Sequence, residues 1–131
     1  AQGLQKTDRP IAGLVKDLKR LGLLDSTVVH WGGEMGRLPV VQNTRNAGRD
    51  HNTYGFSMWL AGGGFKAGHI HGETDEWGHR SVRDKVNHYD YHATLLRLFG
   101  LDHDHLNYKR GGRVQSLIDG QPARVVEEIM A

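Results

Sequence analysis

The chain has 131 residues and contains no cysteine. This absence excludes a disulfide framework, a thiolate metal site and a cysteine nucleophile. Long apolar runs are missing as well, because none approaches the roughly 18 residues of a membrane-spanning helix. The N-terminus has neither a signal-peptide layout nor an initiator Met. We therefore expect a fragment or a processed chain without a membrane span.

Charge of one sign is not concentrated in any segment. The formal net charge is +2, and the sequence pI of about 9.1 comes from Lys and Arg residues that are dispersed among acids. No basic stripe marks a nucleic-acid surface, so we expect no nucleic-acid partner. Hydrophobic residues make up 37% and charged residues 24%, which is ordinary for a soluble globular domain.

Histidine and glycine, in contrast, are abundant, with nine and 18 residues. Histidine is the commonest metal ligand and the side chain best suited to proton transfer near neutral pH. Glycine permits tight turns and close approach of other groups to the backbone. Together they favour an α/β protein that carries a site over a helical bundle.

The order of elements predicts an α/β layered fold. An amphipathic helix is expected from Asp8 to Leu21, with Pro10 in its first turn. A continuous apolar strand follows at 27–31, and this pattern is typical of a central parallel strand that is buried on both faces. Residues 32–34 then lie beyond the carboxyl end of the strand, where sites form in open α/β sheets.

The remaining pattern predicts loops, strands and one further helix. Polar residues and turn signals from Met35 to Tyr54 indicate a long loop, and loops of this length are uncommon unless they are functional or disordered. We expect a strand at 56–61 that is ended by the glycines at 62–64, and then turns with a short hairpin at 65–86. A helix capped by Asp90 should follow and run to Phe99. The tail should contain two short strands, near 112–118 and 125–129.

Carboxylates and histidines in the first loops are candidate ligands of a metal ion. Glu34 lies between glycines after the buried strand and can reach a bound cation; the alternative is a loop carboxylate paired with Arg37 or Arg49. Asp50 and His51 can both bind one hard or borderline ion if the turn aims them alike. The alternative is an Asp-His pair in a solvated loop.

A third acidic cluster, Asp75 and Glu76, lies in a turn bounded by glycines. The alternative is a solvated turn in which Trp77 is a packing anchor. His69 and His71 form a His-x-His sequence that could chelate a metal, although surface histidines are the simpler interpretation. No Gly-x-Ser-x-Gly elbow, Walker loop, dinucleotide fingerprint or His-Glu-x-x-His helix is present.

Three blocks in order resemble the C-terminal region of the alkaline phosphatase superfamily. Residues 28–36 resemble its strand that ends in a metal-binding motif, and residues 49–51 resemble a later His motif. Residues 89–101 resemble the Asp-x-x-Pro-Thr-Leu-Leu helix that sulfatases carry near their sheet.

The resemblance is closer to one uncharacterised sulfatase-like family, domain of unknown function 1501. The blocks that carry it are Trp-Gly-Gly-Glu-Met-Gly-Arg-Leu-Pro at 31–39, Gly-Arg-Asp-His at 48–51 and Gly-Glu-Thr-Asp-Glu-Trp-Gly at 72–78. Membership implies that residues 1–131 are a single partial domain, the C-terminal part of a three-layer α/β/α sandwich of the sulfatase type. It also implies an exported or periplasmic protein.

The resemblance places Glu34 where the superfamily has a metal-binding Asp, and His51 where it has a late metal-binding His. With Asp50, these residues are the expected ligands of a divalent metal ion. Met35 departs from the pattern, because many members have a second His ligand there and a thioether binds hard cations poorly. The nucleophile would come from the N-terminal remainder of the same polypeptide, so we expect this chain alone to be inactive.

Two functions remain open at this point. The first is a metal-dependent hydrolase of sulfate or phosphate esters, acting on a small molecule or a polysaccharide. Its candidate substrate-binding residues lie in the same blocks and are Arg37, Arg49, Asp75 and Glu76. The second is a non-catalytic sulfatase-like module that recognises an anionic polysaccharide.

Overall fold

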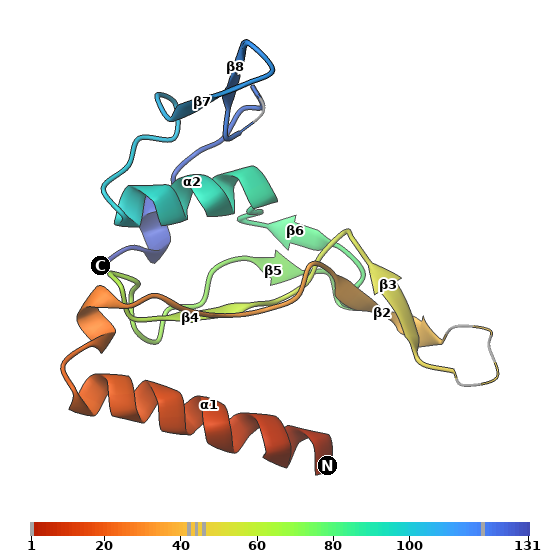
Figure 1. Ribbon diagram of the computed structural model, residues 1–131. Coiled ribbons are helices and arrows are strands. Elements are labelled where there is room, and N and C mark those ends of the chain that lie inside the picture. The colour runs from red at the N-terminus through yellow and green to blue at the C-terminus, as the bar shows by residue number, and fades with distance from the viewer. Residues whose placement is uncertain (1, 42, 44, 46, 119) are drawn as a thin grey trace.

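The computed structural model describes residues 2–41, 43, 45, 47–118 and 120–131. It is a mixed α/β structure with two α-helices and small antiparallel sheets. Helix α1 (Gln2–Arg20) lies on one side of a two-stranded ladder, and helix α2 (His88–Leu98) lies on the other side (Figure 1). Among the described residues, no helix has the length and apolarity to cross a membrane.

The central ladder consists of β1 (Val29–Trp31) and β4 (Trp59–Ala61). The two strands are antiparallel, with Val29 opposite Ala61 and Trp31 opposite Trp59. The prediction of a central parallel strand at 27–31 is therefore wrong. A short β-branched run is compatible with any strand that is covered on both faces. The apolar pattern does not indicate whether the neighbouring strand runs parallel or antiparallel to it.

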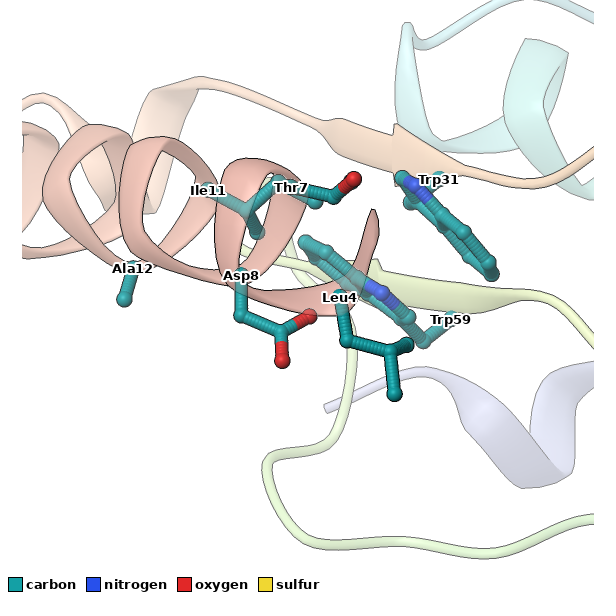
Figure 2. Close-up of a pocket in the computed structure, with 7 residues that line it drawn as sticks. All are labelled: Leu4, Thr7, Asp8, Ile11, Ala12, Trp31 and Trp59. Carbon is teal, nitrogen blue, oxygen red and sulfur yellow. The ribbon is translucent and has the colours of Figure 1, made fainter. Parts of the chain in front are cut away.

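Successive side chains of β1 point to opposite faces of the ladder. The His30 ring packs toward α2, with its centroid 5.4 Å from that of Tyr91. Trp31 and its cross-strand neighbour Trp59 point the other way and line a groove of about 360 Å³ against α1. Figure 2 shows both indole rings beside the helix residues Leu4 and Ile11.

Helix α1 begins six residues before the expected start at Asp8, so Pro10 lies inside the helix instead of in its first turn. An interior proline removes one helical hydrogen bond and crowds the carbonyl four residues earlier, so it weakens the helix at this point, although the helix continues on both sides of it. Val15 and Leu18 are half-buried, whereas Leu14 is 51% exposed. The helix therefore covers the ladder with a narrow stripe, and a 3-10 turn, η1 (Leu24–Ser26), leads from it into β1.

The expected long loop at 35–54 contains a hairpin, although residues 42, 44 and 46 lie outside the described residues. Strands β2 (Gly36–Val41) and β3 (Arg49–Asn52) pair antiparallel, with Arg37 opposite His51. Gly36 is the first residue of β2 and Gly48 directly precedes β3, whereas Pro39 lies inside β2. The short hairpin expected within 65–86 is confirmed as β5 (Glu73–Thr74) and β6 (Ser81–Arg83), which an ion pair between Glu73 and Arg83 joins.

The glycines at 62–64 end β4 as expected, and each has positive φ, at 70°, 56° and 92°. A Cβ atom on Gly62 would lie 2.3 Å from the carbonyl oxygen of Leu24, and one on Gly63 would lie 2.3 Å from the Val28 side chain. The turn therefore requires glycine both for its backbone conformation and for its close packing against the entry to β1.

Helix α2 starts at His88 and is capped by Asn87, not by Asp90 as expected. The Asn87 side chain accepts a hydrogen bond from the Asp90 N–H, and the Asp90 carboxylate accepts one from the Asn87 N–H. Asp90 is thus the third residue of a capping box. Gly100 follows the helix with φ of 74°, as expected for a C-terminal glycine.

The buried polar face of α2 fixes the C-terminal segment. Oδ1 of Asp90 accepts a hydrogen bond from the Arg124 N–H at 2.9 Å. The Thr94 hydroxyl donates to the Asp90 carbonyl at 2.7 Å and accepts from the Val126 N–H at 2.9 Å. Thr94 and Val126 are completely buried, so the two bonds of the Thr94 hydroxyl are shielded from water, whereas the bond from Arg124 is partly buried.

The C-terminal segment also contacts the turn after β4. The Lys66 N–H donates to the Ile129 carbonyl at 2.9 Å, and the Ala131 N–H donates to the Gly64 carbonyl at 2.8 Å. The expected strand near 125–129 is instead a 3-10 turn, η2 (Glu127–Ile129). The other expected tail strand, near 112–118, corresponds to β8 (Arg113–Ser116), which pairs with a strand that was not expected, β7 (Asn107–Arg110).

Much apolar surface stays exposed in this arrangement. Among the described residues, the buried apolar side chains are those of Ala93, Ile118 and Val126. The accessible surface is 10195 Å². A compact monomer of the same mass exposes about 6,900 Å². The chain therefore leaves roughly 3,300 Å² more surface in water than a closed fold of its size would.

Replacing Thr94 with valine should destabilise the fold. The substitution keeps the shape of the side chain but leaves the buried Val126 N–H without an acceptor. The free energy of unfolding should fall by about 1–3 kcal/mol, measured by urea denaturation of the full chain. The exposed Thr53→Val is the matched control. Equal stability of the two variants would contradict a role for Thr94 in holding the C-terminal segment.

Candidate functional site

Three blocks of sequence meet at one open groove of about 410 Å³. Residues 31–37 supply the end of β1 and the start of β2, and Arg49 supplies the start of β3. Thr74 and Gly78 come from the turn region around β5. Its lining residues are Trp31, Gly33, Met35, Gly36, Arg37, Arg49, Gly55, Phe56, Ser57, Thr74 and Gly78. The groove thus joins blocks that are more than 40 residues apart in the sequence.

Two arginines supply the charge of this groove. Arg37 on β2 donates from Nη1 to the carbonyl oxygen of Arg49 at 3.2 Å, so its side chain crosses to the neighbouring strand. Both arginines are exposed. No carboxylate is among the lining residues, and within the described part of the chain neither guanidinium forms an ion pair. The alternative of a Glu34 pair with Arg37 or Arg49 is therefore not found.

The expected metal ligands Glu34, Asp50 and His51 are all exposed, and they do not form one cluster. Asp50 and His51 are consecutive residues of β3, where neighbouring side chains point to opposite faces of the hairpin. Oδ1 of Asp50 accepts a hydrogen bond from the His51 N–H at 2.7 Å. The pair does not fit one shared ion in this arrangement, and the metal assignment of the three residues stays a prediction.

Asp75 organises the turn between β5 and β6. Its Oδ1 accepts a hydrogen bond from the His79 N–H at 2.7 Å, and its Oδ2 accepts one from the Arg80 N–H at 3.0 Å. The hydrogen bond from His79 contributes most to lowering the pKa of the Asp75 carboxyl below its ordinary value. Glu76 and Trp77 point into solvent, and Trp77 is 72% exposed, so it is no packing anchor within this structure.

Asn52 is a residue of the site that the sequence interpretation missed. It is 1% exposed and directly follows the Asp50–His51 pair. Its Nδ2 donates to the carbonyl oxygens of Gly78 at 3.3 Å and His79 at 3.1 Å, and its Oδ1 accepts from the Tyr54 N–H at 2.9 Å. Asn52 therefore fixes the third block against the second.

Further contacts join the segment after β3 to the β5–β6 hairpin, and we call this contact region the junction. The Ser81 N–H donates to the Tyr54 carbonyl at 3.0 Å. The Tyr54 ring stacks on His79 and lies 5.3 Å from the Arg80 guanidinium carbon. A Cβ on Gly55 would lie 2.6 Å from the Ser81 nitrogen, so this glycine permits the close approach of the two hairpins. His69 and His71 lie outside the junction, with their rings 6.0 Å apart.

Comparison with known families gives one match. The sequence model of a family described as "Protein of unknown function (DUF1501)" matches residues 1–130. No curated protein and no solved structure matches the chain significantly. The family named from the three blocks is thereby confirmed, and its description assigns no function.

The Asn52→Ala variant should lose stability because it removes three hydrogen bonds at a buried position. The carbonyl oxygens of Gly78 and His79 would lose their shared donor. We expect the free energy of unfolding to drop by on the order of 2 kcal/mol. Asn107→Ala, which removes an exposed hydrogen bond, is the control for urea denaturation. An Asn52 variant as stable as this control would refute the role of Asn52 as a junction.

Acid should remove the contribution of the Asp75 carboxylate to the stability of the fold. Because its pKa is lowered in the folded state, its stabilisation is complete above the ordinary carboxyl value of 3.8 and is lost as the pH falls through the lower folded value. The difference in unfolding temperature between the wild type and Asp75→Asn should therefore shrink between about pH 6 and about pH 2.5. A difference that stayed constant over this range would contradict the assignment.

Proposed function

The chain belongs to the family of proteins of unknown function DUF1501, whose description assigns no activity, and we propose from the groove that this site binds the anionic group of a sulfate or phosphate ester. The whole protein would hydrolyse this ester. The single observation that carries the proposal is that three sequence blocks converge on a groove with two arginines and no carboxylate among its lining residues. Neither arginine forms an ion pair with a residue that the structure describes.

Guanidinium groups suit this task. Each one presents several N–H donors in a planar arrangement that matches the oxygens of sulfate or phosphate. Arg37 is held across the hairpin by its bond to the Arg49 carbonyl, which restricts its side chain before an anion arrives. A restricted donor loses less conformational entropy on binding. Asp75 and Glu76 do not line the groove, so the proposal gives the binding role to the arginines.

The remaining parts of the proposal come from the resemblance to sulfatases. We propose that residues 1–131 are the C-terminal part of a three-layer α/β/α sandwich related to the alkaline phosphatase superfamily. The N-terminal remainder of the same polypeptide would supply the nucleophile. The large exposed surface supports this, because excess apolar surface in a folded chain calls for a covering element. An exported or periplasmic location belongs to the same proposal.

A divalent metal ion is the proposed cofactor of the hydrolase, and it would polarise the ester oxygen when bound. Of this chain, Glu34 and one of the two residues Asp50 and His51 could contribute to such an ion. The opposite orientation of neighbouring strand residues argues against all three. The chemical work of this chain would then be the binding and orientation of the anionic group by Arg37 and Arg49.

The second candidate is a non-catalytic module that recognises an anionic polysaccharide. One observation favours it: Trp31 and Phe56 line the same groove as the arginines and are 48% and 40% exposed. Exposed aromatic rings offer large, rigid contact area at low entropic cost. Such a surface fits a sugar ring beside its sulfate group. This candidate requires binding without turnover.

The groove arginines should determine anion binding. In calorimetric titration of the full chain with inorganic sulfate and phosphate, Arg37→Ala and Arg49→Ala should each weaken binding about tenfold, which corresponds to the loss of one charge-assisted contact. Arg113→Ala, on the exposed strand β8, is the control. Equal affinity in all three variants and the wild type would exclude the groove as the anion site.

Turnover separates the two candidate functions. A polypeptide that includes the N-terminal remainder is incubated with nitrophenyl sulfate, nitrophenyl phosphate and a sulfated polysaccharide. Hydrolysis that falls in the Arg37 and Arg49 variants supports the hydrolase. Binding of the polysaccharide that depends on the same arginines, without hydrolysis of either ester, supports the binding module.

A further inference from the structure

A second group of potential ligands lies between α2 and β7, outside the groove. It consists of Asp102, His103 and Asp104, which follow the helix-ending Gly100 after one residue. One ligand atom from each of the three lies within 4.8 Å of the others. Within the described parts of the chain, no other group of three His or acidic residues is so close.

The state of His103 distinguishes this group from an ordinary acidic turn. Its side chain is 12% exposed, although both neighbouring aspartates are open to water. Its Nε2 atom is buried and has no hydrogen-bond partner. A buried polar atom without a partner destabilises the fold, because it has lost its hydrogen bonds to water. A ligand that occupies Nε2 would remove this destabilisation.

The spacing of the atoms fits a metal ion better than a hydrogen bond. Nε2 of His103 lies 3.5 Å from Oδ1 of Asp104, which is long for a hydrogen bond between these groups. Two ligands of a tetrahedral ion with bonds of about 2.1 Å lie roughly 3.4 Å apart. An ion between these two atoms would therefore need little movement of either side chain.

Asp102 is already oriented by its neighbours. Its Oδ1 accepts a hydrogen bond from the Asp104 N–H at 3.0 Å, and its Oδ2 accepts one from Nδ1 of His105 at 2.6 Å. Each carboxylate oxygen has a second lone pair for an ion. Hydrogen bonds of this kind around a ligand fix its orientation and increase metal affinity.

We propose that Asp102, His103 and Asp104 bind one divalent transition-metal ion of the zinc class. An imidazole nitrogen with two carboxylates suits zinc, whereas magnesium and calcium prefer oxygen ligands alone. The ion would order the connection between the end of α2 and the start of the β7–β8 hairpin, because its three ligands are consecutive residues of that connection. This site does not depend on the proposed anion groove.

The test is a zinc titration of the full chain after removal of metals with a chelator. Competition with a chromophoric chelator gives the affinity, and imidazole ¹⁵N spectra identify the histidine that changes. We expect one zinc ion per chain with the change at Nε2 of His103. His103→Gln and Asp104→Asn should weaken binding at least about tenfold.

The controls separate this site from the other histidines and carboxylates. His69→Gln and Asp25→Asn, both at exposed positions, should bind zinc as the wild type does. If His103→Gln loses its circular dichroism spectrum, the exposed Asp104→Asn decides the result. Wild-type affinity in Asp104→Asn, or an equal loss in His69→Gln, would overturn the proposal.

Discussion

The buried hydrogen bonds of Asp90 and Thr94 are the constraint on which the rest of the structure depends. They hold the backbone of the C-terminal segment at Arg124 and Val126. That segment in turn bonds to Gly64 and Lys66, directly after β4. Helix α2 is thereby connected to the central ladder through an irregular segment as well as through its own side chains. Because the two Thr94 bonds are buried, each one costs more to lose than an exposed bond would.

This constraint also explains which parts of the fold could be predicted. The helix near 90–99 and the turn at 62–64 follow from local signals, namely apolar periodicity and a run of three glycines, and both are present. The antiparallel pairing of β1 with β4 does not follow, because pairing direction depends on residues 30 positions apart. The cap of α2, in contrast, is a local signal: Asn87 and Asp90 have the spacing of a capping box, and the prediction of Asp90 as the N-cap overlooked it. Only the bond from Arg124 to Asp90 lies beyond local sequence rules.

The candidate site shows the same division. The sequence blocks around Arg37, Arg49 and Thr74 could be identified, and the structure brings parts of all three to one groove. The roles within them could not. Adjacent acids and histidines look alike as ligands in sequence, but the pleat of β3 separates Asp50 from His51. Asn52 carries no signal as a single letter, since only its burial and its three partners reveal its function.

The exposed surface and the groove arginines have a common consequence. In the open chain, water solvates both guanidinium groups, so an anion gains less by binding there than it would in a site shielded from water. An element that covered the apolar surface next to Trp31 would also reduce the water around the groove. Two desolvated cations without a carboxylate are unfavourable unless an anion is present. Docking of the covering element and binding of an anion would therefore favour each other. The anion would offset the desolvation of the two arginines, and the covering element would remove the water that competes with the anion.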